Sequence, residues 1–161
     1  MDIILREAQK SDMRSVLFLI RELATFEKEA DAVEVSESDL IRDGFGKHPF
    51  FKVYVAEEEN EIIGMALFYE RFSTWKGRSI HLEDLIVKRE HRNKGVGKAL
   101  YTKVLTHAYK QKFKRVSWEV LDWNKVAIDF YKSTGAKILD DWQVVHMNER
   151  ALEDFVNKQR V

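Results

Sequence analysis

A short glycine-rich and basic stretch contains the residue types that most directly suggest chemistry. It reads Arg92, Asn93, Lys94, Gly95, Val96, Gly97 and Lys98. Glycines let a backbone approach a ligand closely, and the free N–H groups at the start of a helix attract phosphate oxygens. Because the neighbouring arginine and lysines add positive charge, the stretch predicts a site for a ligand that carries a pyrophosphate.

Three phosphate-binding patterns compete here, beside the simpler interpretation that the two glycines serve helix capping and packing. A Walker A loop needs four residues between its glycines and then Gly-Lys-Ser/Thr, which this stretch lacks. A dinucleotide fingerprint needs a third glycine where Leu100 stands, although Glu119 lies at a suitable distance for a ribose contact. The third pattern, Arg-x-x-Gly-x-Gly after a long strand, fits Arg92, Gly95 and Gly97.

A second segment downstream has helical spacing, with Asn124, Ala127, Phe130, Tyr131 and Gly135. We expect Asn124 to cap a helix that Gly135 ends. Ala127 and Phe130 share one apolar face. Tyr131 begins another face, which looks toward the glycine-rich stretch if the two helices flank one cleft. The alternative for Tyr131 is a core side chain with a satisfied hydroxyl.

Two adjacent acids, Glu83 and Asp84, interrupt the apolar strand predicted over residues 79–88. Since neighbouring residues of a strand point to opposite faces, we expect the two carboxylates on opposite faces and at least one of them in a wet cleft. A carboxylate in a cleft is suited to deprotonating an amine. The alternative is a buried carboxylate paired with a base.

The charges cancel over the whole chain but are distributed unevenly. Lys plus Arg number 27, and Asp plus Glu also number 27. The segment Glu27–Asp39 carries six acids and one base, whereas Lys88–Lys98 carries five lysines or arginines and one acid. The acidic segment suits a cationic ligand and the basic one a polyanion, unless both are solvated surface. Zero net charge argues against a nucleic-acid binder.

Length and composition predict one folded domain over residues 1–161, with 45% hydrophobic residues to form a core. The absence of cysteine excludes disulfides, thiolate metal sites and cysteine nucleophiles. The five histidines show no paired metal spacing, so we expect no metal. The sequence has neither an apolar run long enough to span a membrane nor a visible signal peptide, so we expect no membrane association and a cytoplasmic location.

Hydrophobic periodicity and turn residues predict a mixed α/β fold. Strands are predicted at 3–7, 51–57, 61–71, 79–88, 114–121 and 143–147. Helices are predicted from Ser11 to about Lys28, from Ser36 to near Gly44, from about Gly95 to Gln111, from Asn124 to about Thr134, and at the C-terminus. Antiparallel strands come first, and a strand–helix–strand unit with two parallel strands follows.

The glycine-rich stretch and the second segment together resemble the two acetyl-CoA segments of the GNAT superfamily of N-acetyltransferases. The first match is Arg92-x-x-Gly95-x-Gly97 and the second runs from Asn124 to Gly135, in the family's order and separation. The resemblance implies the GNAT acyl-CoA N-acyltransferase fold, an α/β domain with a mixed sheet.

Nearly the whole chain is similar to one branch of that superfamily, the spermidine/spermine acetyltransferases and their relatives that act on thialysine. The matching segments are 20–24, 43–50, 75–77, 82–84 and 123–124. The chain departs from the animal enzymes in a shorter hairpin at Glu58–Asn60, in Phe26 where a tyrosine is expected, and in an abbreviated stretch before Trp142. These departures touch the acceptor side and so concern the substrate rather than the reaction type.

This resemblance implies direct transfer of an acetyl group from acetyl-CoA to an amine in a ternary complex. It implies that Tyr131 gives a proton to the departing thiolate and that Glu83 orients the amine or takes its proton through water. Backbone N–H groups of Leu85, Ile86 or Val87 would bind the carbonyl oxygen. The acetyl-CoA residues implied are these three, the seven from Arg92 to Lys98, and Asn124, Ala127 and Tyr131. The acceptor residues implied are Phe26, Glu27, Trp75, Glu83, Glu119 and Trp142.

We expect the acceptor to be a small di- or polyamine or a lysine-like amine, and the resemblance implies a homodimer. One alternative is an acetyltransferase that acts on a peptide lysine or an N-terminus. Another is a CoA-binding module without catalysis, against which Glu83 and Tyr131 speak. A third is a nucleotide-dependent oxidoreductase, which Leu100 disfavours.

Overall fold

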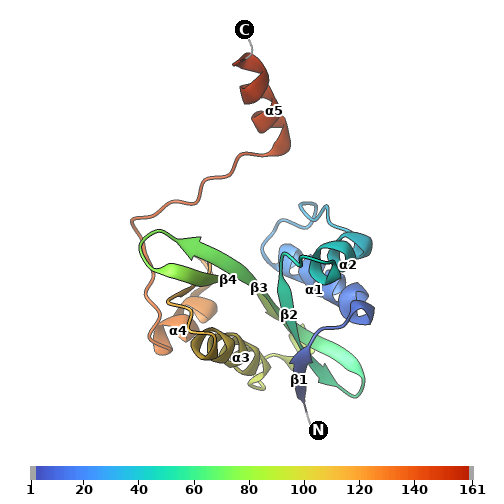
Figure 1. The fold of residues 1–161 in the computed structure, drawn as a ribbon. Coiled ribbons are helices and arrows are strands. Elements are labelled where there is room, and N and C mark those ends of the chain that lie inside the picture. Colours follow the sequence, from blue (N-terminus) through green and yellow to red (C-terminus); the bar gives the residue numbers. More distant parts are fainter. Residues whose placement is uncertain (1–2, 160–161) are drawn as a thin grey trace. The chain divides into compact units, whose positions relative to one another are not determined.

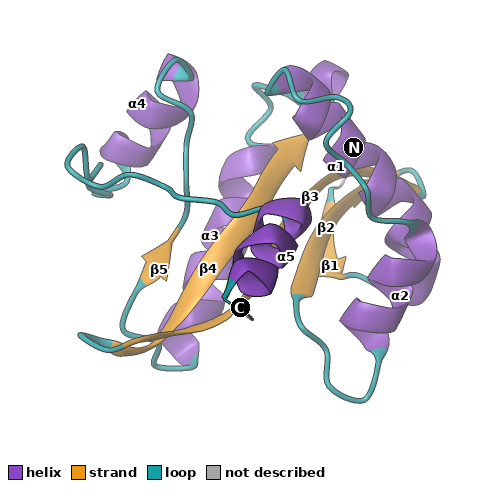
Figure 2. Ribbon diagram, turned by 90° about the horizontal axis from the view of Figure 1, so that it is seen from above, coloured by secondary structure: helices purple, strands orange, loops and turns teal. Residues whose placement is uncertain are grey.

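Five strands form one mixed sheet among residues 3–159, the part of the chain that this computed structural model describes. In sheet order they are β1 (Ile4–Glu7), β2 (Lys52–Glu58), β3 (Glu61–Ser73), β4 (Gly77–Val87) and β5 (Val116–Ser117). Neighbours from β1 to β4 are antiparallel, and β5 is parallel to β4 (Figure 1, Figure 2). The predicted α/β class with a mixed sheet and a parallel strand–helix–strand unit is confirmed.

The chain divides into two compact units. The first ends at Leu121 and holds the sheet, whereas the second begins at Asp122 and holds α4 (Lys125–Ser133) and α5 (Glu149–Lys158). A single domain over residues 1–161 stays a prediction. Of the helices in the described residues, none is long and apolar enough to cross a membrane.

The helices α1 (Met13–Phe26) and α2 (Glu37–Phe45) pack on one face of the sheet. Their apolar side chains form a buried core with alternate residues of the central strands. Its members are Met13, Val16, Leu17, Leu19, Leu40, Val53, Val55, Ile62, Met65, Leu67 and Ile86. Because strand residues alternate between faces, Met65 and Leu67 identify the α1/α2 face along β3.

The start of α1 differs from the prediction that Ser11 caps it. Ser11 lies inside a short 3₁₀ turn, Lys10–Asp12, and Asp12 stands at the N-cap of α1. The Asp12 carboxylate accepts the backbone N–H of Gln9 at 2.6 Å and pairs with Arg6 at 2.7 Å. These bonds close the 3₁₀ turn first, so the α-helix begins later than periodicity alone indicates, and it ends two residues earlier.

Two local signals act as predicted. Ser36 begins α2 through a capping box, in which Asp39 N–H donates to Ser36 Oγ at 3.2 Å and Ser36 N–H donates to the Asp39 carboxylate at 2.9 Å. The β2–β3 hairpin turns through Glu59 and Asn60, whose φ values are 52° and 66°. Positive φ at both turn residues matches the twist of the strands that they join.

The helix α3 (Val96–Lys110) packs on the opposite face of the sheet. Leu100 and Val104 of α3 are fully buried. Phe68 follows Leu67 on β3 and therefore points away from α1, and its ring centroid lies 5.3 Å from that of His107 on α3. The helix predicted from about Gly95 to Gln111 is thus confirmed, and it follows β4 closely enough to present its start beside the end of that strand.

Two predicted strands are wrong in extent or existence. Of residues 114–121, only Val116–Ser117 form a strand. Residues 143–147 form no strand, are exposed, and pair with no strand among the described residues. A strand needs a neighbour to satisfy its N–H and C=O groups, so an apolar sequence alone does not create one. The predicted C-terminal helix is present as α5.

Candidate active site

The strand β4 contains a bulge at its two adjacent acids. Leu67 of β3 pairs with Asp84, and the next residue of β3, Phe68, pairs with Leu82, so Glu83 has no partner across this ladder. An extra residue of this kind shifts the alternation of every residue after it. The bulge therefore decides where Glu83 and Asp84 point.

Both carboxylates lie on the α1/α2 face, so the prediction that they occupy opposite faces is wrong. Asp84 shares the face of its partner Leu67, a member of the buried core there. Glu83 accepts the hydroxyl of Tyr69 at 2.9 Å, and Tyr69 lies two residues from Leu67 on the same side of β3. The alternation of side chains between the two faces fails here because β4 has one residue more than β3 at the bulge.

Glu83 is a half-exposed carboxylate with donors on one of its oxygens. Its side chain keeps 49% of its surface exposed to solvent, and its place in a wet cleft stays a prediction. Oε2 accepts the Tyr69 hydroxyl at 2.9 Å and lies 3.5 Å from Nε2 of His81. Burial, and then the hydrogen bond and charge of Glu83, raise the pKa of Tyr69 to about 12. The phenol therefore keeps its proton and remains a donor.

Asp84 is an acidic residue of this region that the predicted catalytic and acceptor residues did not include. Burial, and then the negative charges of Glu83 and Glu27, raise the pKa of Asp84 to about 7. Burial also raises the pKa of Glu27, which directly follows α1. The signal in the sequence was the acidic pair itself, but only the bulge shows that its second member faces the same region as the first.

Four acidic side chains from three separate segments act on one region: Glu27, Glu83, Asp84 and Glu119. The charge of Glu119, which follows β5, contributes to the raised pKa of Tyr69, the residue that Glu83 also contacts. Within residues 3–159, no three His, Asp or Glu side chains are grouped so as to hold a metal ion. Two other predicted acceptor residues are strongly exposed, Trp75 in the β3–β4 turn by 77% and Trp142 after α4 by 66%.

The sheet opens between β4 and β5 beyond the bulge. In the described part of the chain, β5 pairs with β4 only at Ile80 and His81. The rest of β4 up to Val87 is paired on one side, with β3. One edge of this stretch therefore carries backbone groups that no strand of the described chain pairs.

Alternation decides which backbone groups face that open edge. The N–H of Lys88 donates to the carbonyl of Ile63 on β3 at 2.8 Å. Ile86, two residues earlier, therefore also directs its N–H toward β3, whereas Leu85 and Val87 direct theirs toward the open edge. Of the three N–H donors predicted for a substrate oxygen, the geometry favours Leu85 and Val87.

The glycine-rich stretch forms the turn into α3. Gly95 is the N-cap residue, and its φ of 84° requires the conformational freedom of glycine. In the described chain, no acidic residue lies in the first turn of α3 and no side chain caps it. With Lys94 and Lys98 beside it, this helix start fits a pyrophosphate. A Cβ at Gly97 would meet only Val87 Cγ2, at an ordinary 3.6 Å, so packing does not require glycine there.

Arg92 connects the glycine-rich stretch to the end of β4 and to α1. Its Nε donates to the carbonyl of Val87 at 2.9 Å, and its guanidinium carbon lies 5.5 Å from the ring centroid of Phe26. The bond to Val87 agrees with the direction inferred for that residue. Phe26, predicted on the acceptor side, thus lies beside Arg92, predicted on the cofactor side, and the two parts of the predicted site meet here.

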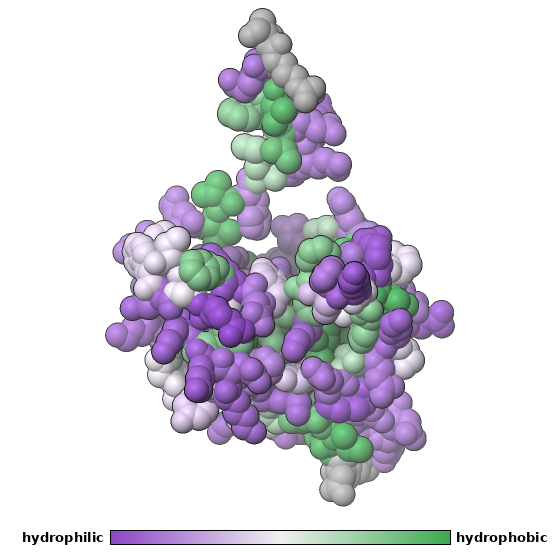
Figure 3. Space-filling view, in the orientation of Figure 1, coloured by the Kyte–Doolittle hydropathy of each residue, from purple (hydrophilic) through white to green (hydrophobic). Residues whose placement is uncertain are grey.

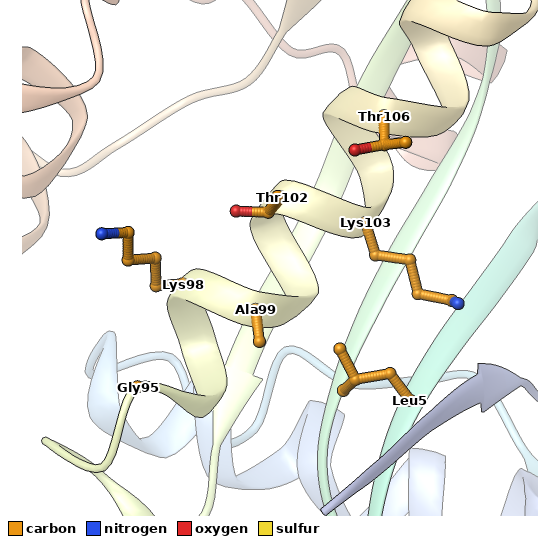
Figure 4. Close-up of a pocket in the computed structure, with 7 residues that line it drawn as sticks. All are labelled: Leu5, Gly95, Lys98, Ala99, Thr102, Lys103 and Thr106. Carbon is orange, nitrogen blue, oxygen red and sulfur yellow. The ribbon is translucent and has the colours of Figure 1, made fainter.

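A shallow hollow of about 530 Å³ runs along α3 from the same turn. Its lining residues are Leu5, Gly95, Lys98, Ala99, Thr102, Lys103 and Thr106 (Figure 4). Lys98 and Lys103 extend to opposite sides of it, and Thr102 and Thr106 lie about one turn apart along the helix (Figure 4). The lining contains two cations and no acid, so the hollow continues the cationic side of the site.

The second unit carries the other predicted motif. Asn124 caps α4 by accepting the N–H of Ala127 at 3.3 Å, and Gly135 follows the helix with φ 90°, both as predicted. Tyr131 is buried, and its ring centroid lies 5.4 Å from that of Phe130. The roles of Asn124, Ala127 and Tyr131 at the cofactor stay predictions.

The sequence and the fold are both similar to those of known proteins. The sequence matches the model of the acetyltransferase (GNAT) family over residues 16–136. It is similar to the thialysine N-epsilon-acetyltransferase of Bos taurus, with 39% identity covering 97% of this chain and 98% of that protein. It is also similar to the spermidine/spermine N(1)-acetyltransferase-like protein 1 of Homo sapiens, with 31% identity covering 94% of this chain and 23% of that protein. Among solved structures, an integron cassette protein from the mobile metagenome of V. cholerae has a TM-score of 0.79 and 25% identity, covering 97% of this chain and 98% of that one.

Proposed function

This chain belongs to the GNAT family of acetyltransferases, and from that premise we propose that it transfers the acetyl group of acetyl-CoA to the primary amine of a small cationic acceptor. The acceptor is a di- or polyamine, or a thialysine- or lysine-like amine. The observation that carries this proposal is a group of four carboxylates, in which Glu27 and Glu83 act on Asp84, and Glu83 and Glu119 act on Tyr69. Such a group attracts an acceptor with more than one positive charge.

On the donor side, acetyl-CoA supplies an acetyl group activated as a thioester. The start of α3 binds its pyrophosphate through backbone N–H groups, with Lys94 and Lys98 adding positive charge. The N–H groups of Leu85 and Val87, at the open edge of β4, donate hydrogen bonds to the acetyl carbonyl oxygen and stabilise the negative charge that develops on it. The support for these roles is the φ of 84° at Gly95 and the separation of β4 from β5 after His81.

On the acceptor side, Glu83 takes a proton from the amine, directly or through one water molecule. The neutral amine nitrogen then attacks the carbonyl carbon, the carbon–sulfur bond breaks, and the nitrogen gives its second proton to solvent water as the amide forms. The half-exposed position of Glu83 allows contact with both substrate and solvent. Asp84, next to it on the same face, attracts the cation that brings the amine there.

Tyr131 donates the proton that the departing thiolate needs. A phenol is a weak acid, with a pKa of about 10, but a thiolate is basic enough to accept its proton. The support for this role is the match of Tyr131 to the tyrosine of the family's second acetyl-CoA segment, on a helix that begins and ends as that match predicts.

The test is acetyl-CoA turnover, read as release of free thiol, over a panel of amines. The panel holds putrescine, spermidine, spermine, thialysine, lysine and a lysine-containing peptide. We expect one of the small cations to give the highest kcat/KM and the peptide to react poorly. Binding of acetyl-CoA without turnover on any amine would favour a CoA-binding module, and preference for the peptide would overturn the proposed acceptor.

We also propose that the chain forms a homodimer and acts in the cytoplasm. Exposed apolar side chains support the homodimer, because a second copy would cover them. They include Val144, Val145 and Met147 before α5, and Leu152, Phe155 and Val156 on α5, whose apolar surface Figure 3 shows. Sedimentation at assay concentration is expected to give twice the chain mass, and a monomer would contradict the proposal.

A further inference from the structure

His81 is a buried histidine whose ring is held by its neighbours in the sheet. It lies on β4 opposite Tyr69 of β3, and only 8% of its surface is exposed. The two ring centroids are 5.3 Å apart, with 35° between the planes. The ring therefore packs against Tyr69, and in this orientation each of its two nitrogens meets a different set of groups.

Arg71 decides which nitrogen carries the proton. Its Nη1 lies 3.4 Å from Nδ1 of His81, and the hydroxyl of Ser117 lies 3.5 Å from the same nitrogen. A guanidinium has only N–H donors, so Nδ1 must accept. The hydrogen-bond network thus assigns the proton of the neutral ring to Nε2, which lies 3.5 Å from Oε2 of Glu83.

Glu83 needs such a contact because of where it lies. As the extra residue of the bulge it has no partner across the β3–β4 ladder, and half of its side chain is exposed. The Tyr69 hydroxyl of β3 donates to its Oε2 at 2.9 Å, and Nε2 of His81 on β4 lies 3.5 Å from the same oxygen. With Oε2 held in this way, Oε1 is the oxygen left to meet an amine.

We propose that Arg71 and His81 are positioning residues for Glu83. Arg71 selects the His81 tautomer that donates toward Glu83, and His81 together with Tyr69 holds the carboxylate in the orientation that receives the amine proton. The inference rests on the proposed function for what Glu83 does. His81 does not relay that proton, because its Nε2 already carries one and its Nδ1 faces a cation.

The tautomer is tested without any turnover, by the ¹⁵N chemical shifts of the His81 ring at pH 8. We expect a protonated Nε2 and an unprotonated Nδ1 in the wild-type chain, and a mixture of both tautomers in Arg71→Leu. A wild-type ring protonated at Nδ1 would overturn the inference, as would an unchanged ring in Arg71→Leu. Because this measurement needs no acceptor, its outcome is independent of whether the proposed function holds.

Kinetics and crystal structures of two matched variants test the consequence for Glu83. His81→Phe keeps the ring but loses the donor, and we expect kcat on the best amine to fall about tenfold with KM for acetyl-CoA unchanged. His81→Gln keeps an N–H donor and is expected to recover most of that loss. Crystal structures should show the Glu83 carboxylate ordered in His81→Gln and displaced from Tyr69 in His81→Phe.

Equal kcat in His81→Phe and the wild-type chain would overturn the inference. So would a loss in His81→Gln as large as that in His81→Phe, since that pattern indicates a requirement for the imidazole itself. If the wild-type chain turns over no amine, the proposed function fails, and the tautomer and the order of Glu83 still decide the positioning role.

Discussion

At the scale of single residues, the protonation of Asp84 at the proposed site affects the free energy of unfolding. Burial, helped by two nearby carboxylates, raises the pKa of Asp84 from 3.8 to about 7. An acid with a raised pKa binds its proton more tightly in the folded chain than in the unfolded one. Its contribution to stability is therefore complete below about pH 4 and is lost as the pH rises through about 7.

The predicted consequence is a pH-dependent loss of stability that Asp84→Asn removes. A shift of about three units corresponds to about 4 kcal/mol, and solvent near a partly exposed carboxyl reduces this to about 2 kcal/mol. Between pH 4.5 and pH 8, the free energy of unfolding in urea should fall by about 2 kcal/mol less in Asp84→Asn than in the wild-type chain. Asp31→Asn, at an exposed position, is the control, and equal pH dependence in all three chains would contradict the raised pKa.

Tyr131 is proposed to donate a proton to the thiolate, and Glu83 to accept one from the amine. Substitutions of the two residues should therefore change different kinetic parameters. Tyr131→Phe should lower kcat by about 100-fold while acetyl-CoA still binds. Glu83→Gln should lower kcat, raise KM for the amine, or both, and should change the pH–rate profile. Stopped assays of thiol release and calorimetric titration with acetyl-CoA measure these effects. Tyr109→Phe, on the exposed side of α3, is the control, and near-normal turnover of Tyr131→Phe would rule out the proposed acid.

The limits of sequence-based prediction are clearest at the bulge. The acidic pair in an apolar strand was a sufficient signal that Glu83 lies in a polar environment. The direction of Asp84 was predicted wrongly, because it depends on the register between β3 and β4, where Leu67 pairs with Asp84 and Phe68 with Leu82. Register is a property of two strands together, and a period-two pattern in one strand cannot contain it.

At the scale of elements, the turn into α3 contains two glycines that we expect to have different roles. Gly95 is needed for the backbone conformation, and Gly97 is needed for the close approach of the ligand. Gly97→Ala adds a Cβ that meets Val87 at an ordinary 3.6 Å, so the melting temperature should hardly change. If the backbone there approaches the pyrophosphate, KM for acetyl-CoA should rise about tenfold. Gly95→Ala is the matched comparison. At φ 84° it should destabilise the fold by about 1 kcal/mol.

Melting curves and acetyl-CoA saturation curves of the two glycine variants together test whether Gly97 serves ligand binding or packing. A Gly97→Ala chain with wild-type KM would show that the ligand does not approach this glycine. A Gly97→Ala chain that melts early would restore the interpretation in which both glycines serve packing.

Several elements whose limits depend on local chemistry were predicted well, although the start of α1 at Asp12 rather than Ser11 was not. The capping box at Ser36, the cap at Asn124 and the two turn residues after Glu58 each act within a few residues of themselves. Elements that depend on distant partners were not. Residues 143–147 have the apolar sequence of a strand but no neighbour among the described residues, and β5 pairs with β4 over only two residues before the sheet opens.

At the scale of the whole molecule, the net charge of zero is the sum of an acidic segment, Glu27–Asp39, a basic segment, Lys88–Lys98, and the charges of the rest of the chain. The sequence predicted both: the basic stretch around Gly95 leads into a helix start without acids, and the acidic segment begins at Glu27, which acts on Asp84. It did not predict that Asp84 joins Glu27, Glu83 and Glu119 in one region, because these residues come together only through the fold. A donor with phosphates and an acceptor with ammonium groups are thereby attracted to different parts of one chain.

This charge separation predicts that salt should weaken the reaction with multiply charged acceptors most. Exposed charges are screened over roughly 10 Å at about 0.1 M salt and roughly 3 Å at about 1 M. We expect kcat/KM for spermidine to fall about tenfold between about 20 mM and about 500 mM salt, and that for a monoamine of similar length to fall about threefold or less. Glu119→Gln should reduce the spermidine value and its salt dependence and leave the monoamine nearly unchanged, because the proposal assigns the reacting nitrogen to Glu83 and only charge attraction to Glu119. If kcat/KM falls by the same factor for the two amines, the four carboxylates of Glu27, Glu83, Asp84 and Glu119 do not select the acceptor by its charge.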